Sequence, residues 1–470
     1  MNPQTAAGQA MDVSLELFDK LKAQLRGPLL KAGDPGYEDS RTVWNGMIQR
    51  HPSMVARCLG VADVVTGVRF ARENGLTLCV KGGGHNIAGL AVANGALMLD
   101  LGAMRGVWVD PKERMARAQA GCLLGDVDRE TQLHGLAATL GFVSNTGIAG
   151  LTVGGGFGYL TRRNGWTSDT VTEMEVVTAE GKIVRANERE NADLFWGLRG
   201  GGGNFGIVTR FDYRLDPLGP EIMAGAMAWR EERAPEVFAL QREIMADAPP
   251  ELAIVSGLRK APPAPWLSKD VHGQGIVLIA VCHSGSAADG EKLVARFKSL
   301  DGAVGDVLQR RTYVSQQSLL DATQPKGRRY YWKSEYLPKL SDELFEKAIN
   351  HAKTITSPHG AVLLFPIGEA VGRLPNDHSA VGNRDARWVI NIAGSWDKAE
   401  DDAAQVEWAR TAWRDVRPLS TGGTYINFLT EEEDGDRIQS AYGTNLTRLT
   451  EIKRKWDPEN VFRTNKNIKP

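Results

Sequence analysis

The stretch that decides the fold is Val80-Lys-Gly-Gly-Gly-His-Asn-Ile-Ala-Gly89, in which the apolar strand 76–80 runs directly into three glycines. Glycine lets the backbone approach another group closely, and the bare N–H groups of such a turn suit the pyrophosphate of a dinucleotide. The run is not a GxGxxG that opens a helix and has no GK[ST], which excludes a Rossmann fold and a P-loop. A lone histidine is usually structural, but His85 inside this turn is a candidate site residue.

Two further glycine-rich segments follow along the chain. Residues 144–165, SNTGIAGLTVGGGFGYLTRRNG, interleave glycines with apolar residues, which disfavours a flexible surface loop and favours a wall around a flat ring system. Residues 194–215, LFWGLRGGGGNFGIVTRFDYRL, run from four glycines into a strand, as expected of a turn beside a ligand. Of the 52 glycines, 25 lie between Gly82 and Gly206, so the excess belongs to one region, which predicts a nucleotide cofactor there.

Composition excludes several classes of protein. With 56 Lys and Arg against 57 Asp and Glu, the chain has no basic surface for nucleic acid. It has no apolar run of about 18 residues that would span a bilayer. The first 25 residues have no apolar signal-peptide core, so we expect a bacterial cytosolic protein. The 4 cysteines lack CxxC spacing and the 8 histidines lack HxxxH or HExxH spacing, so we predict no metal site and no disulfide framework.

Short strands and helices alternate along the chain, which predicts an α+β fold. Residues 1–105 and 106–217 form two units that carry most of the glycines, and DPLGP at 216–220 marks a boundary. Beyond it, strand-like runs (275–281, 388–392) and helix-like runs (341–353, 401–414) indicate a substrate domain at 218–425. A helix is predicted over 436–455, followed by a turn and an extended end.

The motifs in their order resemble the berberine-bridge-enzyme-like flavoproteins of the vanillyl-alcohol-oxidase superfamily, which share the PCMH-type FAD-binding fold. They are GGGHNIAG at 82–89, NTGIAGLTVGGGFG at 145–158, LFWGLRGGGGNFGIVT at 194–209, TYINF at 424–428 and YGTN…RLTEIKRKWDPENVFRTNKNI at 442–468. The resemblance extends from about Tyr37 to Asn467. It implies an FAD-binding domain of two α+β subdomains (1–105 and 106–217), a substrate domain of antiparallel sheet and helices (218–425), and a segment, 426–470, that returns to the FAD domain.

The resemblance also implies which residues meet the FAD. His85 would bond covalently to the flavin 8α-methyl carbon. Many relatives carry a cysteine that bonds to flavin C6, and Ala149 lies about where it would fall. We therefore predict a single histidyl link and no cysteinyl link, as in the single-histidine bacterial branch. The other residues predicted to bind the cofactor are Lys81, Gly82, Gly83, Gly84, Asn86, Gly89, Thr146, Gly147, Thr152, Gly154, Gly155, Gly156, Gly158, Gly206, Ile207, Val208, Asn465 and Asn467.

Oxidation of a hydroxyl carbon sends a hydride to flavin N5 and requires a base for the hydroxyl proton. TYINF contains no histidine, so we predict that Tyr425 is the base and that Asn427 orients substrate or flavin. An ordinary tyrosine has a pKa of about 10, so a nearby positive charge would be needed to stabilise its phenolate. Lys333 and Arg373 are predicted pocket residues that could supply it, as could Arg384.

The predicted function is an FAD-dependent oxidase that takes a hydride from a small hydroxylated substrate, such as an alcohol, a sugar or a secondary-metabolite phenol. Its partners would be that substrate and O2, which becomes hydrogen peroxide. Three alternatives stay open: a flavin-dependent oxygenase or oxidative tailoring enzyme of aromatic polyketide or natural-product biosynthesis, a dehydrogenase with a different electron acceptor, and a flavin-binding protein without turnover.

Overall fold

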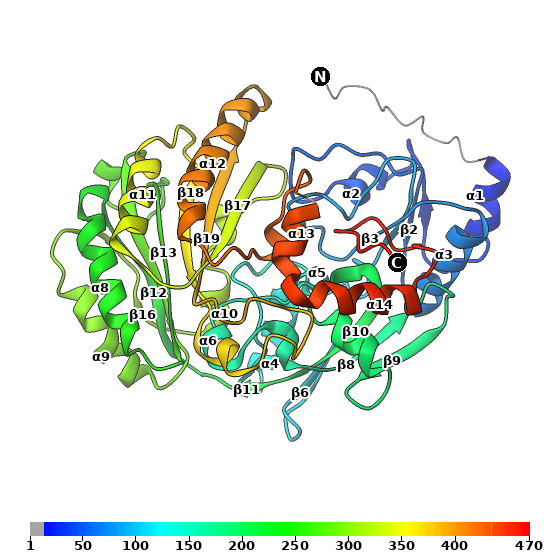
Figure 1. Ribbon diagram of the computed structural model, residues 1–470, viewed down its shortest axis with the longest axis horizontal. Coiled ribbons are helices and arrows are strands. Elements are labelled where there is room, and N and C mark those ends of the chain that lie inside the picture. The colour runs from blue at the N-terminus through cyan, green and yellow to red at the C-terminus, as the bar shows by residue number, and fades with distance from the viewer. Residues whose placement is uncertain (1–13, 434) are drawn as a thin grey trace.

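A computed structural model describes residues 14–433 and 435–470 and arranges them as two units side by side (Figure 1). The predicted α+β class is confirmed, with helices packed on largely antiparallel sheets. The prediction that the first 25 residues contain no signal-peptide core concerns in part residues 1–13, which lie outside the described residues. No described helix has the length and apolar character needed to cross a membrane.

The first unit begins with a four-stranded sheet in the order β1-β2-β4-β3, in which β2, β4 and β3 are parallel. The helix α3 connects β2 to β3 and packs on β4 with the apolar face seen in the sequence. The elements of this sheet and its surroundings are α1 (Leu15–Lys22), β1 (Leu29–Leu30), α2 (Tyr37–Arg41), β2 (Met54–Arg57), α3 (Val61–Glu73), β3 (Leu78–Lys81) and β4 (Leu97–Asp100).

A second, antiparallel sheet completes this unit in the order β5-β6-β10-β8-β9. Its central strand β10 is almost wholly buried, whereas β5 alternates half-buried and exposed residues, as expected of an edge strand. The elements are β5 (Val107–Asp110), β6 (Met115–Gln119), α4 (Leu124–Gln132), β7 (Leu136–Ala137), α5 (Ile148–Val153), α6 (Thr161–Asn164), β8 (Val171–Val177), β9 (Ile183–Asn187), α7 (Ala192–Leu198), β10 (Ile207–Arg214) and β11 (Asp216–Pro217).

The second unit is built on an eight-stranded antiparallel sheet, ordered β15-β12-β14-β13-β18-β19-β17, with β16 also paired to β12. Both β14 and β19 are buried along nearly their whole length because the sheet is covered on both faces. The strands are β12 (Ile222–Arg230), β13 (Leu252–Lys260), β14 (Gly275–His283), β15 (Ala303–Asp306), β16 (Gln309–Arg311), β17 (Arg329–Leu337), β18 (Ala361–Pro366) and β19 (Trp388–Trp396).

Helices cover one face of this large sheet, on the left in Figure 1. They are α8 (Ala234–Ala246), α9 (Ala287–Lys298), α11 (Asp342–Lys353) and α12 (Asp402–Val416), while the short α10 (Tyr313–Gln317) packs on α4. The opposite face meets the first unit, and we call it the site face. It is defined by Val255, Phe365, Val389 and Tyr336, which cluster with Phe157 of the first unit.

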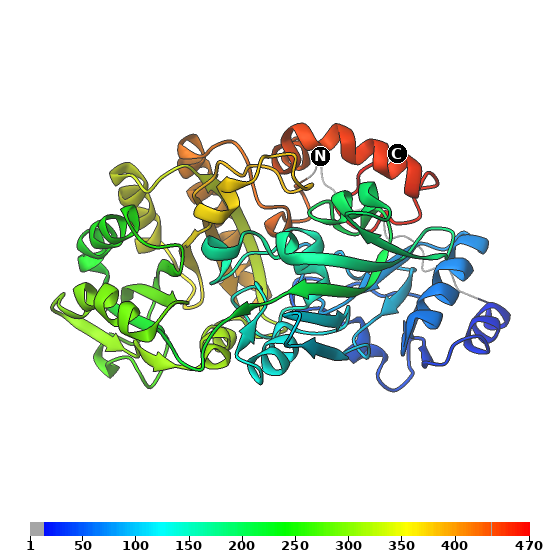
Figure 2. The same cartoon turned by 90° about the horizontal axis from the view of Figure 1, so that it is seen from below.

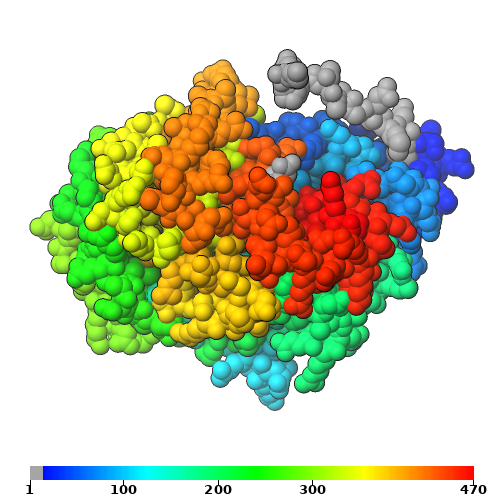
Figure 3. Space-filling model, in the orientation of Figure 1, coloured from blue at the N-terminus to red at the C-terminus, as the bar shows by residue number. Residues whose placement is uncertain are grey.

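The C-terminal segment returns to the first unit and lies along its side (Figures 2 and 3). The single helix predicted over 436–455 is wrong: α13 (Gly435–Tyr442) and α14 (Leu446–Trp456) are separated at Gly443, which has a φ of 55°. Within α14, the buried Lys453 Nζ donates to Asp457 Oδ2 at 2.6 Å and to the carbonyl oxygen of Asn204 at 2.8 Å. This buried ion pair fixes the returning segment to the first unit.

Residues 44–46 connect the two units directly. The Asn45 side chain donates to the carbonyl oxygens of Ile87 (2.8 Å) and Tyr330 (2.9 Å) and accepts from Tyr330 N (3.1 Å). Trp44 stacks on Tyr330 with ring centroids 3.7 Å apart, and Gly46 N donates to the carbonyl oxygen of Arg328 at 2.7 Å. These contacts hold the site face in a fixed position over the first unit.

Candidate functional site

The glycine turn that follows β3 is open to a ligand. None of the five N–H groups from Gly82 to Asn86 donates to a protein acceptor among the described residues. Behind the turn, a Cβ placed on Gly83 would lie 2.4 Å from the backbone nitrogen of Gly147, so the first two glycine loops pack back to back. The glycines at these two positions therefore allow a close backbone contact, and the turn directs unused donors to one side.

His85 stands at the end of this turn with a defined environment. Its Nε2 lies 3.0 Å from Asn145 Oδ1, and its ring stacks on Trp44 at 4.7 Å between centroids with a 19° tilt. Burial lowers the pKa of His85 to about 4, partly opposed by the bond to Asn145. The imidazole is therefore neutral near pH 7. Because the Asn145 oxygen accepts the Nε2 proton, the lone pair is left on Nδ1.

The second glycine loop is bound within the protein. Gly154, Gly155, Gly156 and Gly158 all donate their N–H groups to protein oxygens. A Cβ on Gly154 would lie 2.1 Å from Asn427 Oδ1, and Gly155 has a φ of 106°. These glycines therefore give the returning segment room to approach, which is a reason for their presence that does not involve a cofactor.

Tyr425 and Asn427 meet at this contact, as their predicted joint role requires. The Tyr425 hydroxyl oxygen accepts from Gly156 N at 3.0 Å and from Asn427 Nδ2 at 2.8 Å. The Tyr425 ring stacks on Trp166 (5.9 Å) and is 2% exposed. Burial raises the pKa of Tyr425, while the two N–H donors oppose that rise.

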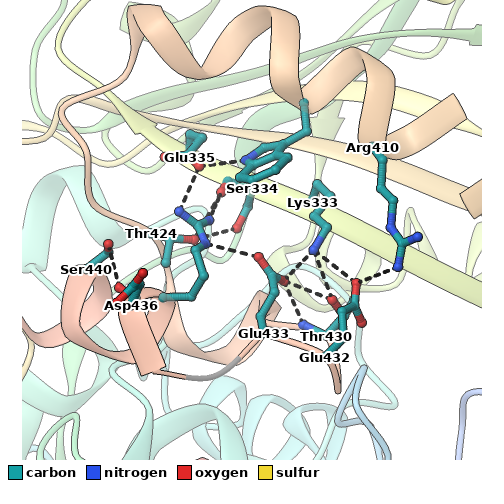
Figure 4. Close-up of polar contacts among 12 residues, drawn as sticks. Lys333, Ser334, Glu335, Arg410, Thr424, Thr430, Glu432, Glu433, Asp436 and Ser440 are labelled. Carbon is teal, nitrogen blue, oxygen red and sulfur yellow. Dashed lines mark hydrogen bonds and ion pairs between the residues drawn. The ribbon is translucent and has the colours of Figure 1, made fainter. Parts of the chain in front are cut away.

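The three cations proposed to stabilise the Tyr425 phenolate do not do so in this structure. Lys333 has the opposite orientation along β17 from the site-face residue Tyr336, because successive side chains of a strand alternate. Its Nζ pairs with Glu432 (3.1 Å) and Glu433 (3.2 Å), in the network of Figure 4. Lys333 is therefore a structural cation, and its assignment to the substrate pocket is wrong.

The two arginines are likewise placed elsewhere. Arg384 is buried and makes a two-point ion pair with Asp169, at 2.9 and 2.7 Å. Arg373 ends the 3₁₀ helix Glu369–Arg373 and is exposed. Among residues 14–433 and 435–470 no cation contacts the Tyr425 hydroxyl, and the N–H groups of Gly156 and Asn427 polarise its oxygen instead.

Several predicted cofactor residues have structural partners in the described chain. Lys81 Nζ pairs with Asp100 at 3.1 Å, and Thr152 Oγ1 bonds the Tyr213 hydroxyl at 2.7 Å. Glycine is required by packing at two further positions, Gly89 against Ile48 and Gly206 against Val176. Ile207 and Val208 are buried in β10, Asn86 Oδ1 accepts from Leu90 N, and Gly84 has a φ of 69°.

Two predicted residues of the C-terminal tail leave one side-chain oxygen each without a partner. Asn465 and Asn467 each bury a side-chain oxygen that has no protein partner. A buried polar atom without a partner is costly unless a ligand or water satisfies it. Both residues, together with the open N–H groups of the His85 turn, fit a bound group with hydrogen-bonding edges.

Sequence reasoning missed some residues of the site. One is Trp44, which packs on His85. The other is Trp332 on the site face, whose ring centroid lies 5.4 Å from that of Trp44 and 5.0 Å from that of Phe428. No glycine turn or spaced polar group marks either tryptophan in the sequence. Asn145 is part of the glycine-rich motif at 145–158, but no pattern there singles it out. No cluster of three or more metal-ligating side chains occurs among the described residues.

The fold and these residues define a flavin-dependent oxidoreductase, and comparison with known proteins specifies its family. The family described as "FAD binding domain" matches residues 52–187, and "Berberine and berberine like" matches 424–469. The (R)-6-hydroxynicotine oxidase of Paenarthrobacter nicotinovorans is 31% identical over 95% of this chain and 97% of its own length. The chain belongs to the berberine-bridge-enzyme-like FAD-dependent oxidoreductases, as the motifs predicted.

Other relatives agree with this assignment. The crystal structure of 6-hydroxy-D-nicotine oxidase from Arthrobacter nicotinovorans superposes with a TM-score of 0.84 at 26% identity, covering 95% of this chain and 98% of that one. The chitooligosaccharide oxidase of Gibberella zeae is 25% identical over 98% of this chain and 96% of its own length. The chain is therefore an FAD-dependent oxidoreductase with the two-domain fold of this family.

Proposed function

We propose that this protein is an oxidase that holds FAD through a single covalent bond from His85 to the 8α carbon and oxidises a small hydroxylated compound at the expense of O2. The observation that carries the proposal is the state of His85: a neutral imidazole with its lone pair on Nδ1, beside five N–H groups without protein acceptors. A neutral ring nitrogen is the nucleophilic form that bond formation needs.

The residues that would hold FAD are the His85 turn and the tail residues Asn465 and Asn467. The N–H groups of 82–86 would donate to an acceptor-rich group, and the two buried amide oxygens would accept from a donor-rich edge. Ala149 offers no thiol, and the four cysteines of the chain are all buried elsewhere. A second, cysteinyl bond is therefore not part of the proposal.

FAD, when bound, would accept the hydride from the substrate carbon. Tyr425 would take the hydroxyl proton, and its oxygen is prepared for negative charge by the N–H groups of Gly156 and Asn427. Asn427 would also keep the phenol ring in place through this bond. The aromatic walls formed by Trp166 and Phe157 around Tyr425 would exclude water from the proton-transfer step.

The first test is the visible spectrum of the purified protein, repeated on the acid-precipitated and washed pellet. We expect flavin absorbance to stay with the pellet in the wild type and in the control His134→Ala, which changes an exposed histidine. His85→Ala should release all its colour. Acid-stable flavin in His85→Ala would refute the covalent assignment.

The second test measures the fate of the electrons. Candidate hydroxylated substrates should bleach the flavin without oxygen and yield one peroxide per substrate in air. Bleaching without peroxide would identify a dehydrogenase, and incorporation of labelled oxygen into the product would identify an oxygenase. If no candidate of these classes bleached a correctly loaded protein, the oxidase proposal would fail in favour of a flavin-binding protein without turnover.

A further inference from the structure

One row of the site face of the large sheet carries small side chains between two large ones. One row of cross-strand partners runs Arg259, Ala361, Ala393 and Trp332, from β13 through β18 and β19 to β17. The neighbouring row runs Gly257, Leu363, Asn391 and Ser334. Between Arg259 and Trp332 the first row therefore carries only methyl groups, while a guanidinium and an indole project from its two ends.

Arg259 has no acidic partner. Its Nε donates to the carbonyl oxygen of Lys260 at 3.2 Å. No carboxylate among residues 14–433 and 435–470 lies within 4.0 Å of its guanidinium, although the side chain is half-buried. Burial, together with the positive charge of Arg328, lowers the pKa of Arg259 to about 10. A desolvated cation without a counterion is unfavourable, and a ligand anion would remove that cost.

The neighbouring charges do not neutralise Arg259. Arg328 Nε donates to Asp397 Oδ1 at 2.9 Å, and the other oxygen of Asp397 bonds His359 Nε2 at 2.9 Å. Burial lowers the pKa of His359, so this imidazole is neutral near pH 7. Both oxygens of Asp397 are thus engaged by Arg328 and His359, and Asp397 makes no ion pair with Arg259. One positive charge is left over at this end of the row.

The other end of the row is the reactive end. Trp332 packs edge-to-face on Trp44, which stacks on His85, and on Phe428, which contacts Tyr425 at 5.0 Å. Three strand spacings separate the backbones of Arg259 and Trp332, or about 14 Å. An elongated small molecule that spans this distance from Trp332 would bring its far end to Arg259.

We propose that the substrate carries a carboxylate at the end remote from the carbon that is oxidised, and that Arg259 binds this carboxylate with the help of Arg328. The proposal rests on the oxidase function above and specifies its substrate class as a hydroxylated carboxylic acid. The planar fork of an arginine matches the two oxygens of a carboxylate, which favours this anion over a spherical one.

The test is a binding experiment on the FAD-loaded protein that requires no turnover. The probes are biphenyl-4-carboxylate and its uncharged analogue biphenyl-4-carboxamide, and the readouts are titration calorimetry and the change in the visible flavin spectrum. We expect the carboxylate to bind about 10- to 100-fold more tightly than the amide, the range expected for a charge-assisted hydrogen-bonded pair. Raising the salt concentration should reduce this ratio.

The variants separate a binding role from a structural one. Arg259→Gln should bring the ratio close to 1, and Arg259→Lys should retain part of it because the charge remains. Lys260→Gln is the matched control, since Lys260 is the next residue of β13, alternates to the opposite face and donates to the carbonyl oxygen of Thr356. It should keep the wild-type ratio.

A melting experiment completes the design. Because Arg259 has no acidic partner, Arg259→Gln should leave the melting temperature unchanged or raise it. A lower melting temperature would indicate a structural role for Arg259 and overturn the proposal, as would equal binding of the two probes by the wild type. A protein that discriminates the probes but makes no peroxide would keep the carboxylate site and refute the oxidase. Peroxide formation with no preference for acidic substrates would support the oxidase function and refute the carboxylate site at Arg259.

Discussion

Asp128 on α4 offers a quantitative test of the packing between the two units. It is 0% exposed, and its Oδ2 accepts from Gln317 Nε2 of α10 at 3.1 Å. Its other oxygen has no partner, and the nearby Tyr313 hydroxyl is also unpaired. Burial raises the pKa of Asp128 to about 7, with only the bond from Gln317 acting against it.

The sign and size of the effect follow from this shift. An unfolded aspartate titrates near pH 3.9, so between about pH 4 and pH 7 the folded protein binds more protons than the unfolded chain. The free energy of unfolding therefore falls as pH rises through this window and is constant above it. The loss contributed by Asp128 is about 1 to 2 kcal/mol at pH 5 and about 4 kcal/mol at pH 8.

Asp128→Asn removes this loss because it cannot ionise and still offers an oxygen to Gln317. We expect the variant to be more stable than the wild type by about 4 kcal/mol at pH 8 and by about 1 to 2 kcal/mol at pH 5. Urea unfolding of the FAD-loaded protein at both pH values measures the difference. Asp19→Asn, which changes an exposed aspartate of α1, should show no such dependence. An equal gain at both pH values, or a loss at pH 8, would refute the reasoning.

Three further predictions concern the site and its supports. Gly154→Ala places a Cβ 2.1 Å from Asn427 Oδ1 and should lower kcat by about 10-fold or more with FAD retained, while Gly150→Ala, whose Cβ meets nothing within 4 Å, should not. Because burial holds the pKa of Tyr425 above its usual range, kcat/KM should rise from pH 7 to pH 10. A plateau of kcat/KM below pH 9, or a rise that persists in Tyr425→Phe, would contradict this. Lys453→Met leaves Asp457 buried without its cation and should destabilise the fold by about 3–5 kcal/mol in urea unfolding, while the exposed Lys455→Met should cost less than about 1 kcal/mol.

The sequence predicted those parts of the site that depend on local geometry. A strand followed by three glycines defines a turn by itself, so the position of His85 could be inferred. TYINF brings Tyr425 and Asn427 together because only Ile426 separates them, at the start of one short turn. The role of the second glycine loop could not be inferred in full. Its close neighbour, Asn427, lies more than 250 residues further along the chain.

Lys333 shows why the charged residues were harder to assign. Its face of β17 is set by the sheet register, and its partners Glu432 and Glu433 belong to a segment about 100 residues later. The same holds for Trp44, whose contact with Tyr330 depends on how two distant units meet. A one-residue change of register would have moved Lys333 to the site face, and the sequence alone does not specify that register.

The tail that covers β3 has a consequence for how this protein is made. Thr464 Oγ1 donates to the carbonyl oxygen of Leu78 across 386 residues, and Arg463 reaches Thr77 beside it. β3 is an edge strand that leads into the His85 turn, yet the ribosome releases it long before the residues that cover it. Until residues 463 and 464 have left the ribosome, this edge is open to pairing with other chains. The edge therefore stays uncovered through the synthesis of the residues between Leu78 and Arg463, and a protein that lacks residues 461–470 should accumulate as aggregate.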